Sequence, residues 1–307
     1  MANIAVIGAG AWGSALNYAL GVKNTSANAS ATGRKNSELI SLDAALKSEY
    51  IVFAIATQST REFLKKNSSK ISKNAKILVA QKGIETSTGA FLHEIFSEFF
   101  DSKNLAFLSG PSFASEVEKN LPCAVVVSAF NESLSKQWAE FFPPFMKSYE
   151  SSDVIGTEIC GAYKNVIAIA GGICDGMGLG NNARASLMAR GLVEMARFGQ
   201  AFGAKIESFL GLSGAGDLFL SASSELSRNF RVGKMLAKGA DLATILEHLG
   251  EVAEGVPTAH AVVNISAKNG IYTPIANQIS QVINGKDVRQ ALADLLKKIK
   301  MFHIKGF

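Results

Sequence analysis

Short apolar runs alternate with helical segments along the first half of the chain. The runs that stand out are Ile4–Ile7, Tyr50–Ile55, Lys76–Ala80, Leu105–Leu108 and Ala124–Val127. Continuous apolar runs of this length are typical of strands that are buried on both faces. Residues 59–66 and 91–100 between them have helical character. The alternation predicts an α/β fold with a Rossmann-type, doubly wound, mainly parallel sheet, whose ligand crevice lies at the carboxyl ends of the strands.

The second strand of this sheet is the weakest of the predicted strands. Ala27–Thr32 is a plausible candidate and ends at Gly33-Arg34, but Asn28 and Ser30 stand where aliphatic residues are usual. The segment from Lys35 to Glu49 that follows is short. We therefore expect a short connection before the strand that begins near Tyr50.

The pattern changes beyond residue 150. Pro143-Pro144 ends a helix, and the polar stretch Tyr149–Asp153 could cross between two domains. No proline occurs from Phe145 to Val256, and Gly161–Asp175 and Ala183–Phe202 carry apolar residues at helical spacing. The chain is therefore predicted to contain a dinucleotide-binding domain over residues 1–152 and a mainly α-helical substrate-binding domain over residues 153–307.

A glycine pattern follows the first apolar run. Gly8, Gly10 and Gly13 stand between Ile4–Ile7 and the helical run Ser14–Leu20. The first glycine allows a tight turn, the second lets a pyrophosphate approach the backbone, and the third lets the helix pack closely on the strand. Free N–H groups at the helix start then face the phosphates. This pattern predicts a dinucleotide site, although a purely structural glycine turn has the same local sequence.

Composition is that of an ordinary globular protein. The chain has 307 residues, 48% of them hydrophobic and 19% charged, with a net charge of +5. The lysines at 297, 298 and 300 are best explained as a solvated face, so no nucleic-acid partner is expected. The N-terminus reads as a strand without a leader, and the apolar stretches are too short for a membrane span. We therefore expect a cytoplasmic protein.

The cysteines predict neither disulfides nor a metal site. Cys123, Cys160 and Cys174 are an odd number, each in an apolar stretch and without the spacing of metal ligands. Buried, reduced thiols are the expected state.

Three polar stretches in the second half could carry chemistry. Lys164 lies in the small, apolar stretch Gly161–Asn165, where a charge needs a partner or a function. Asp217 follows the small residues of Ser213–Gly216, and Ser227-Arg228-Asn229 offers a hydroxyl, a guanidinium and an amide that suit phosphate oxygens. Taken singly, Lys164 is more often a surface lysine and Asp217 more often a helix cap, and a solvated arginine at a helix end is the alternative for Arg228.

The motifs taken together resemble a known family. In chain order they are Gly8–Gly13, Gln81-Lys82-Gly83-Ile84-Glu85, Gly110–Glu116, Gly161–Asn165, Gly214–Leu218, Ser227-Arg228-Asn229 and Val252-Ala253-Glu254-Gly255. This set resembles the NAD(P)-dependent glycerol-3-phosphate dehydrogenases of the bacterial type over nearly the whole chain. The resemblance implies reversible reduction of dihydroxyacetone phosphate to sn-glycerol 3-phosphate, which supplies glycerol phosphate for phospholipids. It also implies NAD or NADP as the cofactor, a small phosphorylated substrate as the partner and, as an option, a homodimer.

The resemblance also assigns roles to individual residues. Lys164 would donate and accept the proton at the substrate oxygen, and Asp217 would orient it. Further substrate contacts are implied for Lys82, Gly110, Ser112, Ser227, Arg228 and Asn229. Cofactor contacts are implied for Gly8, Gly10, Ala11, Trp12, Gly13, Arg34, Lys82, Ala114, Arg228, Val252 and Glu254.

One departure and two alternatives remain. The family normally has a longer helix and loop after Arg34, so the resemblance says least about the adenosine end of the cofactor. Arg34 itself can pair with a 2′-phosphate, which favours acceptance of NADPH, alongside NADH. A related 3-hydroxyacid or 6-phosphogluconate dehydrogenase would share the glycine turn and the lysine, but its substrate carries a carboxylate. A non-catalytic nucleotide-sensing protein would not need Lys164 and Asp217 together.

Overall fold

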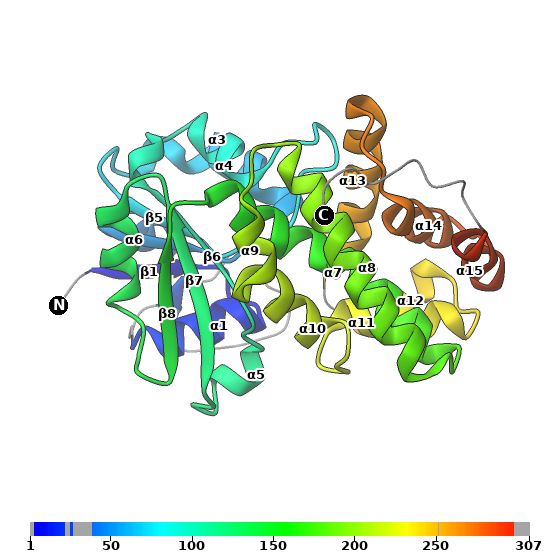
Figure 1. Ribbon diagram of the computed structural model, residues 1–307. Helices are drawn as coiled ribbons and strands as arrows, with labels where there is room; N and C mark the ends of the chain where they lie inside the picture. Colours follow the sequence, from blue (N-terminus) through cyan, green and yellow to red (C-terminus); the bar gives the residue numbers. More distant parts are fainter. Residues whose placement is uncertain (1–2, 22–24, 27–38, 251, 298–307) are drawn as a thin grey trace.

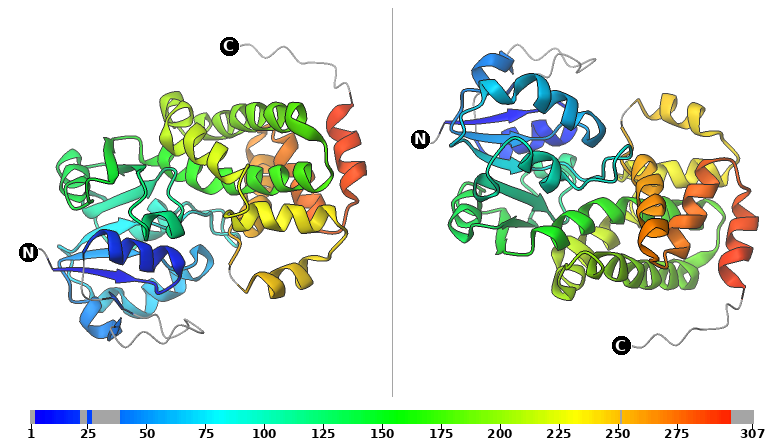
Figure 2. Two further views of the ribbon diagram at one scale, coloured as in Figure 1. Left: turned by 90° about the horizontal axis from the view of Figure 1, so that it is seen from below. Right: turned by 90° about the horizontal axis from the view of Figure 1, so that it is seen from above.

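The computed structural model describes residues 3–21, 25–26, 39–250 and 252–297. The predicted strand at 27–32 and the predicted cofactor residue Arg34 lie outside the described residues. The described chain forms a sheet covered by helices at one end of the molecule and a group of helices at the other (Figures 1 and 2).

The sheet is mainly parallel, as predicted. Its order is β3-β2-β1-β4-β5-β6-β7-β8. The strands are β1 (Ile4–Ile7), β2 (Thr25–Ser26), β3 (Leu39–Ile40), β4 (Tyr50–Phe53), β5 (Lys76–Val79), β6 (Leu105–Ser109), β7 (Cys123–Ala129) and β8 (Met146–Ser151). Every neighbouring pair is parallel except β6 and β7, which run antiparallel with Ala106 opposite Ala129. The predicted Rossmann-type fold class is confirmed, with two reversed strands, because β7 and β8 both run opposite to β1–β6.

The prediction for Tyr149–Asp153 was wrong in part. Tyr149–Ser151 form the end of β8, where Tyr149 pairs in register with Val126, and only Ser152 and Asp153 cross to the helical part. The reason is that β8 lies last in the strand order and leaves most of its side chains partly or fully exposed. Such a strand does not show the continuous apolar run of a central strand.

Helices cover both faces of the sheet. They are α1 (Ala11–Ala19), α2 (Leu42–Ala45), α3 (Thr60–Asn67), α4 (Leu92–Ser97), α5 (Ala114–Val117) and α6 (Glu132–Ala139), with 3₁₀ turns η1 (Thr57–Ser59), η2 (Ser68–Lys70) and η3 (Ser102–Asn104). Successive residues of a strand point to opposite faces. Phe53 of β4 therefore packs with Phe63 and Phe96 from α3 and α4, whereas Val52 joins the cluster that contains Leu16 and Trp138 from α1 and α6.

The helical part is built around one long helix. Its elements are α7 (Val154–Gly176), α8 (Gly180–Gln200), α9 (Ile206–Leu210), the π-helical turn η4 (Leu212–Gly216), α10 (Asp217–Ser221), α11 (Arg228–Ala237), α12 (Leu242–Leu249), α13 (Gly255–Asn269), α14 (Pro274–Ile283) and α15 (Val288–Leu296). Nearly the whole of α7 is buried. A Cβ at Gly172 would lie 1.9 Å from the Phe230 carbonyl oxygen, so the small residues of α7 let α11 approach its backbone.

The start of α7 joins the two parts. Asp153 caps the helix by accepting a hydrogen bond from Gly156 N at 3.0 Å. Its second carboxylate oxygen accepts from Lys205 N at 2.9 Å and from Ser208 Oγ at 2.6 Å. These bonds fix the direction in which α7 leaves the sheet. None of the described helices has both the length and the apolar character that a bilayer crossing requires.

Candidate active site

The predicted polar residues come together where the sheet meets α7. Lys82 follows β5 and Gly110 follows β6, and the carboxyl ends of parallel strands meet at one edge of the sheet. From the helical part, α7 brings Lys164, α10 brings Asp217 and α11 brings Arg228 to the same region. Residues far apart in sequence thus form one cluster.

The centre of this cluster is a carboxylate between two ammonium groups. Asp217 Oδ1 lies 3.0 Å from Lys164 Nζ, and its Oδ2 lies 2.7 Å from Lys82 Nζ. Lys164 also donates to Ser221 Oγ at 2.6 Å, and Lys82 donates to the Gly110 carbonyl oxygen at 3.1 Å. The side chains of Lys164 and Asp217 are only 10% and 2% exposed, so these charges depend on one another.

Burial and the neighbouring charges set the protonation of this cluster. Burial lowers the pKa of Lys164 to about 8; Asp217 opposes this shift, whereas Lys82 and Arg228 add to it. Burial also opposes the charged form of Asp217, but the two ammonium groups outweigh it and hold its pKa below the usual range. Lys164 can therefore exchange a proton near neutral pH while Asp217 stays ionised.

The local sequence explains the position of Asp217. The glycine-rich turn η4 ends directly before it, and a Cβ at Gly214 would lie 2.1 Å from the Phe209 carbonyl oxygen. Asp217 is the first residue of α10 and continues directly from η4. Ser221 stands one turn later on the same face and contacts Asp217 Oδ1 at 3.3 Å. Single π-turns of this kind are frequent at functional sites.

The glycine turn fits a dinucleotide. Gly8 has a φ of +125°, and a Cβ on it would lie 2.4 Å from the Ala54 carbonyl oxygen. A Cβ on Gly13 would lie 1.8 Å from the Gly8 carbonyl oxygen, so α1 packs directly on the turn. Gly10, which precedes α1, faces open space: nothing lies within 4 Å of its Cβ position. Gly8 and Gly13 are thus packed against backbone atoms, whereas Gly10 leaves open space at the start of α1. Phosphate binding requires this open space beside a helix N-terminus.

Three other predicted cofactor residues, Ala11, Trp12 and Ala114, lie on α1 or on the helix α5 that contacts it. Trp12 donates from Nε1 to the Ala80 carbonyl oxygen at 3.0 Å and so links α1 to the end of β5. Ala11 and Ala114 begin α1 and α5, two helices that contact each other. Val252 is exposed and precedes α13. Trp12 braces the turn whether or not it also touches a cofactor.

Glu254 reaches across from the helical part to the sheet. Its Oε1 accepts a hydrogen bond from Thr57 N at 2.8 Å, at the start of η1. A Cβ at Gly83 would lie 2.6 Å from Thr57 Oγ1 and 2.9 Å from Glu254 Oε2, so only glycine leaves these groups room. Burial raises the pKa of the Glu254 carboxyl, and the hydrogen bond from Thr57 N and the charge of Arg228 counteract that shift. Glu254 therefore closes the helical part onto the end of β4.

The Ser227-Arg228-Asn229 motif has two buried residues with structural hydrogen bonds and one half-buried arginine. Ser227 caps α11 by accepting from Phe230 N at 3.3 Å. Asn229 donates to Asn165 Oδ1 at 2.9 Å and accepts from Gly255 N at 3.0 Å. Arg228 is half-buried in the first turn of α11, near enough to Lys164 to affect its pKa. The motif thus ties α7, α11 and the start of α13 together around the cluster.

Sequence reasoning assigned no role to two polar residues of this site. Ser221 contacts Lys164, and its position four residues after Asp217 in a helix was the available signal. Asn165 donates to the Gly161 carbonyl oxygen at 3.2 Å and to the Lys82 carbonyl oxygen at 3.4 Å. Its place next to Lys164 in a buried stretch was the corresponding signal. Ser112, which was predicted, donates to the Gly110 carbonyl oxygen at 3.2 Å beside the cluster.

Comparison with known proteins agrees with this arrangement. Two family profiles match, NAD-dependent glycerol-3-phosphate dehydrogenase N-terminus over residues 35–135 and C-terminus over residues 153–293. The glycerol-3-phosphate dehydrogenase (NAD(P)+) of Wolinella succinogenes is 54% identical over 294 residues, 96% of this chain and 98% of that protein. That of Campylobacter lari is 56% identical over 293 residues, 95% of this chain and 97% of that protein.

Solved structures extend the comparison. The crystal structure of glycerol-3-phosphate dehydrogenase from Coxiella burnetii has a TM-score of 0.89 and 31% identity, covering 97% of this chain and 99% of that one. A D-mandelate dehydrogenase complex with NADH has a TM-score of 0.61 at 13% identity over 94% of this chain and 99% of that one, which shows a shared fold alone. The predicted resemblance is confirmed over nearly the whole sequence: the chain belongs to the NAD-dependent glycerol-3-phosphate dehydrogenase family.

Proposed function

We propose that this protein reduces dihydroxyacetone phosphate to sn-glycerol 3-phosphate with NADH or NADPH, and catalyses the reverse reaction. The observation that carries the proposal is the buried Lys164–Asp217–Lys82 cluster at the edge of a sheet that also bears an open glycine turn. A nucleotide-sensing protein has no use for a buried lysine with a pKa of about 8. Family membership favours this reaction over that of the carboxylate-binding dehydrogenases.

The residues of the cluster have different proposed roles in the reaction. The nicotinamide cofactor, when bound, supplies the hydride for reduction and takes it up in oxidation. Lys164 stabilises the developing alkoxide by its charge and donates a proton to that oxygen. In oxidation neutral Lys164 accepts the proton of the substrate hydroxyl. Asp217 and Ser221 hold Lys164 Nζ in place through the bonds described above.

The substrate phosphate is proposed to bind among the cations at the start of α11. Lys82, Lys164 and Arg228 outnumber the nearby carboxylates of Asp217 and Glu254, which suits a doubly negative ligand. A guanidinium at a helix N-terminus is a strong phosphate donor. Further substrate contacts are proposed for Gly110, Ser112, Ser227 and Asn229.

The cofactor is proposed to bind along the glycine turn and across to the helical part. The proposed residues are Gly8, Gly10, Ala11, Trp12, Gly13, Lys82, Ala114, Arg228, Val252 and Glu254, with Arg34 for the 2′-phosphate of NADP. The free space at Gly10 supports this path. Both NADH and NADPH are proposed to serve.

Three broader proposals concern the whole chain. A domain boundary between residues 152 and 153 is supported by the end of β8 at Ser151 and the start of α7 at Val154. A cytoplasmic location is supported by the free thiols of Cys123, Cys160 and Cys174. A homodimer stays a prediction.

The test of the proposed reaction compares two ketones that differ only in the phosphate. Oxidation of NADPH is followed with dihydroxyacetone phosphate and with dihydroxyacetone. Two charge-assisted phosphate contacts contribute about 1.5 kcal/mol each to transition-state binding. We therefore expect kcat/KM to be at least about 100-fold higher for the phosphorylated ketone. Equal kcat/KM values for the two ketones would contradict the proposal.

A further inference from the structure

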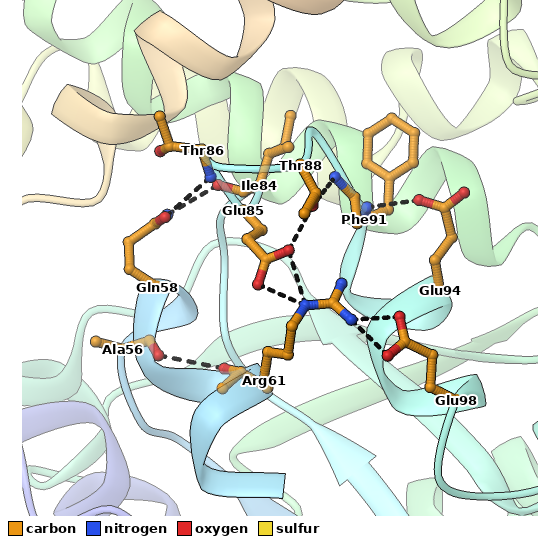
Figure 3. A network of polar contacts seen from close by, with 12 residues as sticks. Ala56, Gln58, Arg61, Ile84, Glu85, Thr86, Thr88, Phe91, Glu94 and Glu98 are labelled. Atoms are coloured by element: carbon orange, nitrogen blue, oxygen red, sulfur yellow. Dashed lines mark hydrogen bonds and ion pairs between the residues drawn. The ribbon is translucent and has the colours of Figure 1, made fainter. Parts of the chain in front are cut away.

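The loop between β5 and α4 carries Lys82 and is fixed along one side by α3 and η1. Gln81 Nε2 donates to Thr60 Oγ1 at 2.5 Å. Gln58 Nε2 donates to the Ile84 carbonyl oxygen at 2.8 Å, and Gln58 Oε1 accepts from Thr86 N at 2.9 Å (Figure 3). Lys82 therefore lies between Gln81 and Ile84, which are each hydrogen-bonded to residues of η1 or α3.

A partly buried ion pair lies at the centre of these ties. Arg61 Nε of α3 lies 2.9 Å and 3.0 Å from the two carboxylate oxygens of Glu85, and Thr88 Oγ1 also donates to that carboxylate. The same guanidinium bonds Glu98 at the end of α4 (Figure 3). The Glu85 side chain is only 5% exposed, whereas that of Glu98 is 47% exposed. Of the two ion pairs of Arg61, the one with Glu85 is therefore shielded from water. A shielded charge depends strongly on its partner.

Among the hydrogen bonds of the described residues, those that join this loop to Gly110, Asp217 and Asn165 all involve Lys82. The other face of the loop enters the helical part: Ile84 is fully buried in the core that surrounds α7, and Thr86 Oγ1 donates to the Pro257 carbonyl oxygen at 3.2 Å. From this loop, Lys82 Nζ donates a hydrogen bond to Asp217. A shift of the loop moves Lys82 relative to Asp217 and Gly110.

We propose that Glu85, held by Arg61, is a positioning residue that sets the place of Lys82 against Asp217 for the reaction. The inference rests on the proposed function, because it assigns Lys82 to the substrate site. Glu85 touches no reacting atom in this account, and it acts by fixing the loop three residues after Lys82. An error of about 1 Å in the place of a binding group can cost about 100-fold in rate.

The first test removes the charge of Glu85 while keeping its shape, and separately removes the guanidinium of Arg61 while keeping its charge. Glu85→Gln and Arg61→Lys are compared with Glu98→Gln, which removes a carboxylate from the same guanidinium at its exposed arm. We expect Glu85→Gln to lower kcat/KM for dihydroxyacetone phosphate by about 10- to 100-fold, with Arg61→Lys between it and wild type. Glu98→Gln is expected to stay within about twofold of wild type. Equal losses in Glu85→Gln and Glu98→Gln would overturn the proposal.

The second test asks whether Glu85 acts through Lys82. Glu85→Gln is measured in wild type and in a Lys82→Ala background, together with the melting temperature of each variant. If Glu85 positions Lys82, its replacement has almost no further effect on kcat/KM once Lys82 is alanine. A general structural role would give the same fold loss in both backgrounds, and that result overturns the proposal.

A third measurement does not depend on turnover. Amide hydrogen exchange over residues 80–91 is expected to speed up in Glu85→Gln and to stay unchanged in Glu98→Gln. Unchanged exchange in Glu85→Gln would overturn the inference even if activity fell. A wild-type protein that does not reduce dihydroxyacetone phosphate would instead refute the proposed function, while the exchange data would still show whether Glu85 orders the loop.

Discussion

Lys164 shows how the surroundings of a single buried residue bring its pKa near neutral pH, where it can exchange a proton. Its ammonium group keeps two bonded oxygens, from Asp217 and Ser221, although it is almost removed from water. Burial and two further cations, Lys82 and Arg228, favour the neutral amine, and Asp217 favours the ammonium. The balance lies close to neutrality, where a general acid and base is most effective.

This balance predicts opposite pH profiles for the two directions. Reduction needs protonated Lys164, so its kcat/KM should fall as the pH rises through about 8. Oxidation needs neutral Lys164, so its kcat/KM should fall as the pH drops through about 8. Initial rates at subsaturating substrate across the pH range check both signs. Profiles that move in the same direction would exclude Lys164 as the titrating group.

At the residue scale the sequence showed the charged groups but not their partners. Lys164 and Asp217 stand out because a charge in a small or apolar stretch is costly. Ser221 and Asn165 do not stand out in the sequence, because serine and asparagine occur both at the surface and in the interior of proteins. Only the fold shows what they contact. The role of Glu85 was equally hidden, because Arg61 lies on another element, 24 residues earlier.

At the scale of elements, the sequence predicted the glycine turn correctly but did not predict the strand at the edge of the sheet. Each of Gly8, Gly10 and Gly13 has the surroundings that its place in the motif predicts. The end of β8 was mistaken for a connection, because an exposed strand lacks a continuous apolar run. The reversed direction of β7 and β8 depends on the packing of several strands and leaves no local signal.

The turn gives a paired prediction for two glycines. Gly13→Ala would place a Cβ 1.8 Å from a backbone oxygen, so we expect a large loss of stability, on the order of 3 kcal/mol or more. Gly10→Ala meets nothing within 4 Å, so the melting temperature should stay unchanged while NADPH binding weakens. Thermal melts and NADPH titrations of both variants check this. A Gly10→Ala variant with normal NADPH affinity would remove Gly10 from the proposed cofactor site.

At the scale of the whole molecule, a few side chains hold the helical part against the sheet. Glu254 bonds Thr57, and Thr86 bonds Pro257. On another side, Glu158 of α7 accepts from His93 N at 2.8 Å and contacts His93 Nδ1 at 2.5 Å. Burial opposes the imidazolium form of His93, but Glu158 outweighs it and raises the pKa of His93; burial also raises the pKa of Glu158.

These shifts predict a stability that declines as the pH rises. Both groups bind their protons more tightly in the folded than in the unfolded protein, so their contribution is present at low pH and is lost as the pH rises through their folded pKa values. His93→Gln should therefore lower the melting temperature by about 2–4 °C more near pH 6 than near pH 8.5. Melts of both proteins at the two pH values provide the check. A difference independent of pH would mean that His93 only fills space.

The most direct test of the proposed mechanism is the turnover of Lys164→Ala, measured together with its affinity for NADPH. Lys164 lies outside the glycine turn, so NADPH binding should stay within about twofold of wild type. Loss of a positioned acid and base should lower kcat for dihydroxyacetone phosphate by at least about 100-fold. Near-normal kcat in a variant that still binds NADPH would contradict the account, because the proton would then come from another group.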